Sequence, residues 1–422
     1  MKLLHTGDLH LGKSLHESSL IEDQKIMLDQ LVKALAEDDY AALVIAGDVY
    51  DRTIPSAEAV ELFSSFLARL RREFPALEIC VIPGNHDSSQ RLSYANRILS
   101  EQRIHIVCSP EESFIPIITA KNGEKLALFL LPFLAPGTLS AERRNARDER
   151  ASNAKASGGF SGELDFSSPI DGETPLLVTQ AALAAEASRR FARALGDKDL
   201  AGIPTVLVAH LFTLNGKSSE SERAFLGNAE EVDPALFAGF TYVALGHLHR
   251  AQAVTERMRY AGSPLAYAFD EAGAAKAFLK VDIGPAASGF PVTVTPIPVI
   301  PFRKVTRLSG AFADFYSGAS FDAHAADYLE ITLTDDAMVA NPMNLLRPKF
   351  PWLLSLRQGL SSGVTPVADD GAQVTESNAD DPRGRRDPLD DFARFEELLY
   401  GFTDEAKREL FSSLLAECAD EA

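Results

Sequence analysis

The stretch Leu43-Val44-Ile45-Ala46-Gly47-Asp48-Val49-Tyr50-Asp51 joins a continuous apolar run to a polar turn. Four successive apolar residues without alternation are typical of a strand that is buried on both faces. Such strands occur in parallel sheets, which gather functional groups at the carboxyl ends of their strands. The stretch therefore predicts a buried strand that delivers the carboxylate of Asp48 to a site.

The same pattern recurs along the chain. Apolar runs at 79–82, 206–209 and 242–245, together with the N-terminal run, each lead into polar residues of types that bind metals. The residues that follow are Gly7-Asp8-Leu9-His10, Gly84-Asn85-His86-Asp87, His210 and Gly246-His247-Leu248-His249. Five strand ends of this kind could converge on one place.

Helical stripes lie between these runs. One consists of Leu28, Leu31, Val32 and Leu35, and another of Val60, Phe63, Leu67 and Leu70. Their spacing is that of one helix face, and packing against the core is the ordinary interpretation. Alternating strands and helices predict an α/β layered domain over residues 1–285.

The remainder of the chain differs in composition. Residues 141–172 are polar and predict a surface loop, and residues 173–197 look helical. Residues 286–360 contain the strand-like run 328–333 and predict a small α+β domain. Residues 361–386 have the composition of a linker. Residues 387–422 predict two amphipathic helices, with apolar faces formed by Phe392, Phe395, Leu398 and Leu399, and by Leu410, Phe411, Leu414 and Leu415.

Composition narrows the class of protein. The 422 residues are 46% apolar and 24% charged, as in an ordinary globular protein. No run approaches the ~20 apolar residues of a membrane span, and the N-terminus lacks the apolar core of a signal peptide. Cys80, Cys108 and Cys418 form neither a disulfide framework nor a metal motif. We therefore expect a cytoplasmic protein with reduced thiols and no contact with a membrane.

The net charge of −19 argues against a protein that coats DNA by itself, because such proteins neutralise phosphates with Lys and Arg. It does not exclude an enzyme that presents bound cations to a phosphate. It also leaves room for a basic partner.

The residue types at the strand ends suit a metal site. Asp8 and His10, like His247 and His249, are two residues apart and would point to one face of an extended segment. Carboxylate, imidazole and amide ligands favour Mn²⁺, Fe²⁺ or Zn²⁺ over Ca²⁺. The glycines before them would let the backbone turn sharply.

Each of these residues has a commoner explanation when it is taken alone. A single histidine at a strand end is usually structural, and an Asp after Gly is usually a turn or helix cap. Their co-occurrence outweighs these alternatives, since five of the nine histidines lie in these loops. His16, His105 and His324 lie outside the pattern and are expected to be structural or surface residues. His5 should point away from the site or pack behind it.

Taken together and in order, these motifs resemble the signature of the calcineurin-like metallophosphoesterases. More narrowly, the chain resembles the SbcD family, the nuclease subunits of the bacterial SbcCD complex. The resemblance is carried by Leu4-His5-Thr6-Gly7-Asp8-Leu9-His10-Leu11-Gly12, Ser221-Glu222-Arg223, the run from Ala244 to Gln252, Arg259-Tyr260-Ala261-Gly262-Ser263-Pro264 and Phe269-Asp270-Glu271. It covers residues 1–283 well and 300–360 loosely, and it resumes at Asp387-Pro388-Leu389. Where that family usually has Ser and Trp, this chain has Gly7 and Leu9, and neither is a ligand.

The resemblance implies a fold and a set of roles. The fold would be a layered calcineurin-like sandwich with a small α+β capping domain and a C-terminal helical tail. Asp8, His10 and His249 would hold one metal, Asn85, His210 and His247 a second, and Asp48 would bridge them. His86 would be the catalytic histidine. Asp51 and Asp87 are candidates for orienting histidines, with turn capping as their alternative role.

The implied activity is that of a DNA exonuclease and endonuclease that uses two divalent ions, Mn²⁺ first among them, in DNA repair, replication and recombination. The chain has no Gly-rich loop with its Lys-Ser/Thr for ATP. The resemblance supplies a coiled-coil ATPase partner, in a heterotetramer with a homodimer of this chain. The helices at 387–422 would be the attachment, with packing on their own domain as the alternative.

Two other classes of function remain open from the sequence. One is a small-molecule phosphodiesterase or phosphomonoesterase that uses the same metal site. The other is a binding or scaffold subunit that keeps the fold without activity. The domain after residue 285 and the tethered helices count against the first, and the complete ligand set with His86 counts against the second.

Overall fold

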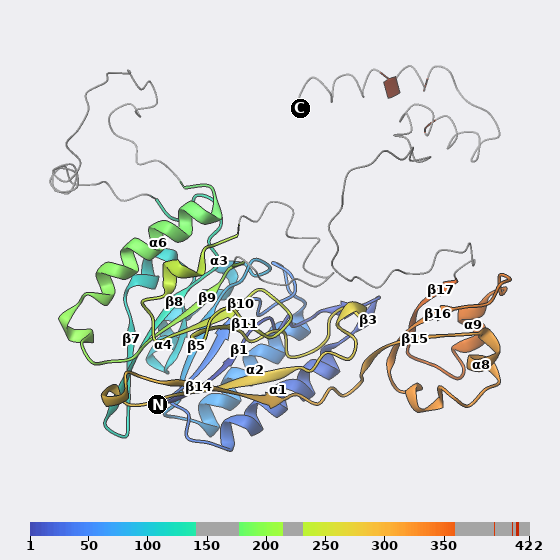
Figure 1. The fold of residues 1–422 in the computed structure, drawn as a ribbon, viewed down its shortest axis with the longest axis horizontal. Coiled ribbons are helices and arrows are strands. Elements are labelled where there is room, and N and C mark those ends of the chain that lie inside the picture. Colours follow the sequence, from blue (N-terminus) through green and yellow to red (C-terminus); the bar gives the residue numbers. More distant parts are fainter. Residues whose placement is uncertain (141–176, 214–230, 359–391, 393–406, 408–410, 413–422) are drawn as a thin grey trace, which may run out of the picture. The chain divides into compact units, whose positions relative to one another are not determined.

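Two six-stranded sheets form the body of the protein. The computed structural model describes residues 1–140, 177–213, 231–358, 392, 407, 411 and 412. The strand orders are β14-β13-β1-β4-β5-β6 and β11-β12-β10-β9-β8-β7. Figure 1 shows helices α1 and α2 beside the first sheet and α6 beside the second. The architecture is therefore a layered α/β sandwich, as the sequence predicts.

The first sheet is built around parallel strands. They are β1 (Lys2–Thr6), β4 (Ala42–Ala46), β5 (Glu78–Ile82) and β6 (Ile104–Ile106). Two antiparallel strands extend its edge, β13 (Ala277–Ile283) and β14 (Val292–Pro298). The carboxyl ends of the four parallel strands consequently meet at one edge.

The second sheet repeats this plan. Its parallel strands are β8 (Glu124–Leu131), β9 (Thr205–His210), β10 (Tyr242–Gly246) and β12 (Met258–Tyr260). The flanking strands β7 (Ile117–Lys121) and β11 (Gln252–Ala253) run antiparallel. Strands β4, β5, β9 and β10 are buried along their whole length, which confirms the interpretation of the continuous apolar runs.

Alternation along each strand divides its side chains between two cores. In β1, Leu4 packs into the core beneath the helices α1 (Ile21–Ala36) and α2 (Ala57–Glu73). Leu3 instead joins the core between the sheets, with Leu128 and Val206 of the second sheet. In α2 the predicted stripe holds except at Val60, which is 43% exposed, and Phe66 is buried with the stripe instead.

Helix α6 (Gln180–Leu195) covers the outer face of the second sheet. Thr179 caps it by accepting a hydrogen bond from the backbone N–H of Ala182. Phe191 packs with Phe129 and Phe240 in the outer core. The helix lies within the range 173–197 that looks helical in the sequence.

Shorter elements are β2 (Ser14–Leu15), β3 (Ser18–Ser19), α3 (Ser89–Leu92), α4 (Asn96–Glu101) and the 3₁₀ turns η1 (Pro110–Phe114), η2 (Lys198–Leu200), η3 (Pro234–Phe237), η4 (Phe269–Glu271), η5 (Ala286–Ser288) and η6 (Asp322–His324).

A separate three-stranded parallel sheet follows. It consists of β15 (Val305–Gly310), β16 (Tyr328–Leu333) and β17 (Leu353–Gln358), with α8 (Phe312–Tyr316) and α9 (Pro342–Leu346). Its own small core includes Phe315 and Phe350. The expected boundary at residue 285 falls between β13 and β14, which pair along their whole length in the large sheet. The small sheet begins only at Val305, because β14 completes the hairpin first.

A polar junction ties this small sheet to α1. The Asp23 carboxylate is 3% exposed and accepts hydrogen bonds from the Tyr328 hydroxyl at 2.8 Å and the Arg303 backbone N–H at 3.2 Å. The Arg303 guanidinium lies 3.8 Å from the same carboxylate and stacks on the Trp352 ring. Both oxygens of Asp23 therefore accept hydrogen bonds from the chain itself.

Several predicted segments fall on parts of the chain that the structure does not describe. The loop 141–172 and the linker 361–386 lie outside the described residues, as does almost all of 387–422. Residues 363–422 form their own unit, in which the rings of Phe392 and Phe411 stack 4.5 Å apart. Among the described residues, no helix is both long and apolar enough to cross a bilayer.

Candidate metal centre

The five strand ends deliver their polar side chains to one edge of the sandwich. Asp8 follows β1, Asp48 follows β4, His210 ends β9 and His247 follows β10. Each of these four side chains is buried. The convergence that the sequence predicts is therefore observed across both sheets.

The backbone at these positions differs from the expected extended geometry. Asp8, His10, Asp48 and His247 have φ values of 52°, 43°, 46° and 107°. These left-handed conformations are uncommon outside glycine and mark a functional or strained site. The prediction that two-residue spacing in an extended segment directs these side chains to one face is therefore wrong, because the segments are not extended. Tight turns aim these ligands, and hydrogen bonds between loops hold them, such as Asp8 N–H to Gly47 O at 3.0 Å.

Two glycines are required by the close approach of the sheets. A Cβ at Gly47, where φ is +90°, would collide with the His210 ring, and a Cβ at Gly246 would overlap the carbonyl oxygen of Ala46. Gly246 has no positive φ, so space, and not the sharp turn expected from the sequence, explains it.

Two imidazoles meet at one end of the site. The Nε2 atoms of His10 and His249 are 3.1 Å apart. The Nδ1 of His10 lies 3.4 Å from a carboxylate oxygen of Asp51, and the Nδ1 of His249 lies 3.2 Å from Oε1 of Glu271. Because a carboxylate only accepts, the Nδ1 of His249 carries the proton and its Nε2 presents a lone pair toward His10.

The other end holds two imidazoles around an amide oxygen. The Oδ1 of Asn85 is 2.9 Å from His210 Nε2 and 3.0 Å from His247 Nδ1, and these two nitrogens are 3.3 Å apart. His210 Nδ1 lies 2.9 Å from the carbonyl oxygen of Ala46, so Nε2 again carries the lone pair.

Asp48 lies between the two ends. Its Oδ2 is 3.6 Å from His10 Nε2 and 3.5 Å from His210 Nε2. Ligand atoms of Asp8, Asp48 and His210 all lie within 4.8 Å of one another, and so do those of His10, Asp48 and His86. The carboxylate is thus shared by both groups, in the position expected of a bridge.

The protonation states of the candidate ligands suit the binding of a cation. Burial lowers the pKa of His10 to about 4 and that of His247 to about 3, so both rings are neutral near pH 7. Burial by itself would raise the pKa of Asp48, but His210 and His10 lower it to about 2, and the group is ionised. Neutral imidazoles and a carboxylate are the protonation states that bind metal.

The donor set fits two divalent cations. The Nε2 atoms of His10 and His249 are 3.1 Å apart, which is the separation that two ligands at about 2.1 Å from one metal show at roughly a right angle. The His10–His249 and Asn85–His210–His247 groups would each hold one ion, with Asp48 between them. Asp8, whose carboxylate lies near Asp48 and His210, would complete the set.

His86 lies at the rim of the site and is only partly buried. Its Nδ1 is 3.0 Å from the carbonyl oxygen of Asp51, and its ring meets that of His10 edge-on at 4.8 Å between centroids. Asn85 faces His210 and His247 while His86 faces His10, so the neighbours serve opposite ends. His86 is close enough to Asp48 to count as a possible ligand, and its catalytic role stays a prediction.

The two other aspartates divide between the roles considered for them. Asp51 lies against His10 and forms a 2.7 Å ion pair with Lys13. Asp87 instead accepts hydrogen bonds from the backbone N–H groups of Val49, Tyr50 and Gly84, which holds the two loops together. For Asp87 the arrangement is that of turn capping.

Histidines outside the ligand set have ordinary partners. His5 packs behind the site, with its ring nitrogens 3.0 Å from the Tyr242 hydroxyl and 3.2 Å from the carbonyl oxygen of Leu245. His105 and His324 pair with Glu78 and Asp327, and His16 tilts against the ring of Phe269.

Sequence reasoning assigned no role to Glu271 and did not single out Lys276. Glu271 is fully buried against His249, and its second oxygen pairs with Lys276 at 2.5 Å. Burial would raise the pKa of Glu271, but the hydrogen bond from His249 and the charge of Lys276 lower it to about 2. Only the quoted motif Phe269-Asp270-Glu271 pointed to this region, and it gave no indication of which acid faces inward.

Comparison with known families agrees with this geometry. Residues 1–251 match the family described as calcineurin-like phosphoesterase. This match spans more than half of the chain and contains the whole ligand set, and the protein belongs to that family. A crystal structure titled a dimetal phosphatase from Danio rerio has 11% sequence identity to this chain and a TM-score of 0.36, covering 72% of this chain and 98% of that one.

Proposed function

We propose that this calcineurin-like phosphoesterase is a Mn²⁺-dependent DNA exonuclease and endonuclease of the SbcD type. The main support for the proposal is that the resemblance to the SbcD family includes residues outside the candidate metal ligands. The segment 259–271, which belongs to that resemblance, surrounds His249: Ser263 N–H donates to its carbonyl oxygen, and Glu271 contacts its ring. A general phosphoesterase site needs the ligands but does not need this particular surrounding segment.

The chemistry follows from the arrangement of the side chains. When bound, two divalent cations would polarise the phosphodiester and lower the pKa of an attacking water. Asp8, His10 and His249 would hold one ion, Asn85, His210 and His247 the other, and Asp48 both. His86, whose Nδ1 lies 3.0 Å from the Asp51 carbonyl oxygen, could use Nε2 to stabilise the phosphate or to give a proton to the leaving oxygen.

Positive charge at the rim favours a polyanionic substrate despite the net charge of −19. Arg52 directly follows Asp51 and has a side chain that is 79% exposed. Arg250 directly follows His249 and is also exposed. Arg52 pairs with Asp51 at 3.6 Å, and the two arginines lie in loops of the metal centre that come from different sheets, so the backbone of a nucleic acid could contact them.

The proposal is tested by comparing substrates on one preparation. The full chain with Mn²⁺ should degrade linear duplex and nick single-stranded circles far faster, per site, than it hydrolyses a generic aromatic bis-ester of phosphate. The Asp48→Asn variant is the control for contaminating nucleases. Hydrolysis of the bis-ester without DNA cleavage would favour the small-molecule phosphodiesterase, and inactivity on both would favour the scaffold class.

We also propose the partners that accompany such a nuclease. Tyr94 and Ile98, which are 84% and 69% exposed around α4, give a second copy of the chain an apolar surface to pack on. Residues 387–422 are the proposed attachment for a coiled-coil ATPase. A chain that ends at residue 365 should keep Mn²⁺-dependent cleavage of simple substrates and lose association with the ATPase. Co-purification of the shortened chain with that partner would contradict the attachment.

A further inference from the structure

Glu271 is a fully buried carboxylate outside the proposed ligand set. It ends the short turn η4, and both of its oxygens are engaged. Oε1 lies 3.2 Å from His249 Nδ1, and Oε2 takes the Lys276 ammonium at 2.5 Å and lies 3.4 Å from the Ser263 hydroxyl. A buried charge of this kind costs free energy unless its partners are well arranged, which indicates a specific use.

Lys276 ties the same group to the backbone that carries His249. Its ammonium donates to the carbonyl oxygen of His249 at 3.0 Å and to the Ser263 hydroxyl at 2.8 Å, besides the carboxylate. The histidine is thereby held at two points, at its ring by Glu271 and at its main chain by Lys276.

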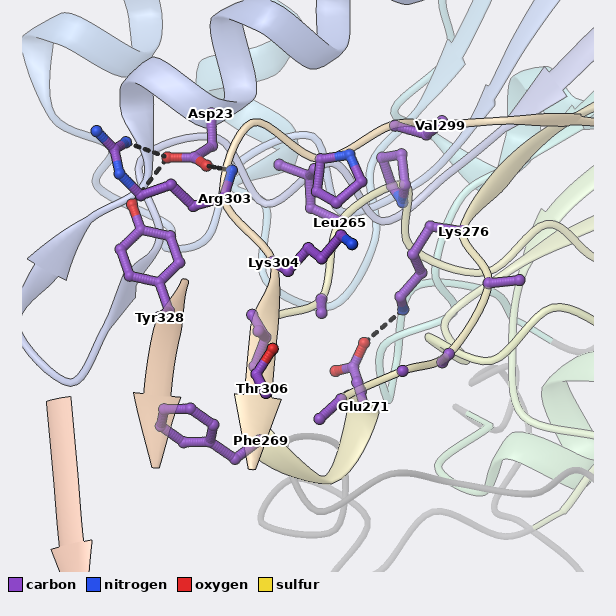
Figure 2. Close-up of a pocket in the computed structure, with 18 of the residues that line it drawn as sticks. Asp23, Leu265, Phe269, Glu271, Lys276, Val299, Arg303, Lys304, Thr306 and Tyr328 are labelled. Atoms are coloured by element: carbon purple, nitrogen blue, oxygen red, sulfur yellow. Dashed lines mark hydrogen bonds and ion pairs between the residues drawn. The ribbon is translucent and has the colours of Figure 1, made fainter. Parts of the chain in front are cut away.

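The ion pair forms one wall of a cavity of about 680 Å³. Figure 2 shows Lys276 and Glu271 facing each other there, with Lys304 and Arg303 across the space and Tyr328 beside them. Solvent and small molecules can therefore approach Lys276 through this cavity, which His249 does not line.

We propose that Glu271 and Lys276 are positioning residues for His249. Glu271 fixes the His249 tautomer with the proton on Nδ1, so the Nε2 lone pair faces His10. Lys276 keeps the carboxylate in place through its ion pair. The inference rests on the proposed cation site but not on DNA as the substrate.

The test measures Mn²⁺ binding to the full-length chain by calorimetric titration. Glu271→Ala should weaken one of the two ions by about 10- to 100-fold, the range seen for partners of metal-bound histidines, and leave the other ion unchanged. Glu271→Gln keeps an acceptor for Nδ1–H and should lose less. Wild-type affinity for both ions in Glu271→Ala would overturn the proposal, as would an equal weakening of both ions.

Lys276 offers a readout that general destabilisation would not give. Lys276→Ala should weaken the same ion, and added n-propylammonium should restore its binding through the cavity. Glu271→Ala should not respond to the amine. The matched control is Lys304→Ala, which removes an ammonium from the same cavity away from His249 and should bind both ions normally. The metal-free Lys276→Ala protein should unfold at the same temperature as wild type. If n-propylammonium then fails to restore its Mn²⁺ binding, the role of the ammonium is contradicted.

The outcome also separates this inference from the proposed function. If Glu271→Ala weakens one ion but the wild-type protein does not cleave DNA, the positioning role holds and the nuclease assignment is refuted. If the wild-type protein cleaves DNA but Glu271→Ala binds both ions normally, the nuclease assignment holds and the positioning role is refuted.

Discussion

Two buried carboxylates of this protein have opposite surroundings. Asp23, at the junction with the small sheet, is 3% exposed and meets a tyrosine hydroxyl, a backbone N–H and an arginine. Asp48, at the strand ends, is 2% exposed and faces imidazole nitrogens at 3.5 and 3.6 Å. Burial is nearly equal, yet both oxygens of Asp23 meet permanent donors, whereas Asp48 accepts from the His86 backbone N–H at Oδ1 and turns Oδ2 to imidazole nitrogens that can bind cations.

This difference distinguishes a structural charge from a ligand. A buried carboxylate whose donors all come from the chain is satisfied by folding alone. Around Asp48, burial holds His10 and His247 neutral, and the Nε2 atoms of His10 and His210 lie 3.6 and 3.5 Å from Oδ2 of the carboxylate. The arrangement is therefore incomplete until cations bind. The two carboxylates should respond differently to every perturbation of metal or of fold.

The largest effect is expected at Asp48. Asp48→Asn should lower the occupancy of both metals and reduce hydrolysis by more than about 1,000-fold, because loss of the ions removes several kcal/mol of transition-state stabilisation. His249→Ala should mainly affect one metal. Elemental analysis of the purified variants measures this. Loss of a single ion in both variants would remove the bridging role.

His86 tests whether a residue beside the ligands acts without holding metal. His86→Gln should retain both ions and lose about 10²- to 10⁴-fold in cleavage rate, the usual contribution of a general acid. Metal content and single-turnover cleavage are measured on the same sample. If the ions leave together with the activity, His86 is a ligand and its assigned role is wrong.

Asp23 should respond in stability and not in metal content. Asp23→Asn weakens hydrogen bonds to a buried charge and should cost about 1.5–3 kcal/mol in the free energy of unfolding. Asp29→Asn is the matched control on the same helix, because its pair with Arg69 is partly exposed to solvent and worth about 0–1 kcal/mol. Urea titration compares the two. Equal costs would show that the junction is not a specific anchor.

His5 gives a smaller, pH-dependent effect behind the metal site. Burial lowers the pKa of His5 to about 3, whereas the unfolded chain takes up the proton near pH 6.5. Stability is therefore present above pH 6.5 and is lost as the pH falls toward 3, by about 2 kcal/mol at pH 5. His5→Gln should remove that share of the loss between pH 8 and pH 5. An unchanged difference would show that His5 is not buried as a neutral group.

The sequence predicts the sandwich and the convergence of its polar strand ends well, because both depend on local patterns. Continuous apolar runs such as 43–46 are typical of buried strands, and the polar residues that end parallel strands meet at one edge of the sheet. What it misses depends on space and turn geometry. The left-handed turn at Asp8, the exposure of Val60 and the inward direction of Glu271 are decided by which segments meet, and no spacing encodes that.

The central claim is that this donor set holds two cations with Asp48 between them. Crystals of the full chain grown with Mn²⁺ and measured at the manganese edge test it most directly. We predict two anomalous peaks, one beside His10 and His249 and one beside Asn85, His210 and His247, with the Asp48 carboxylate contacting both. A single peak, or two peaks of which only one contacts Asp48, would contradict the account.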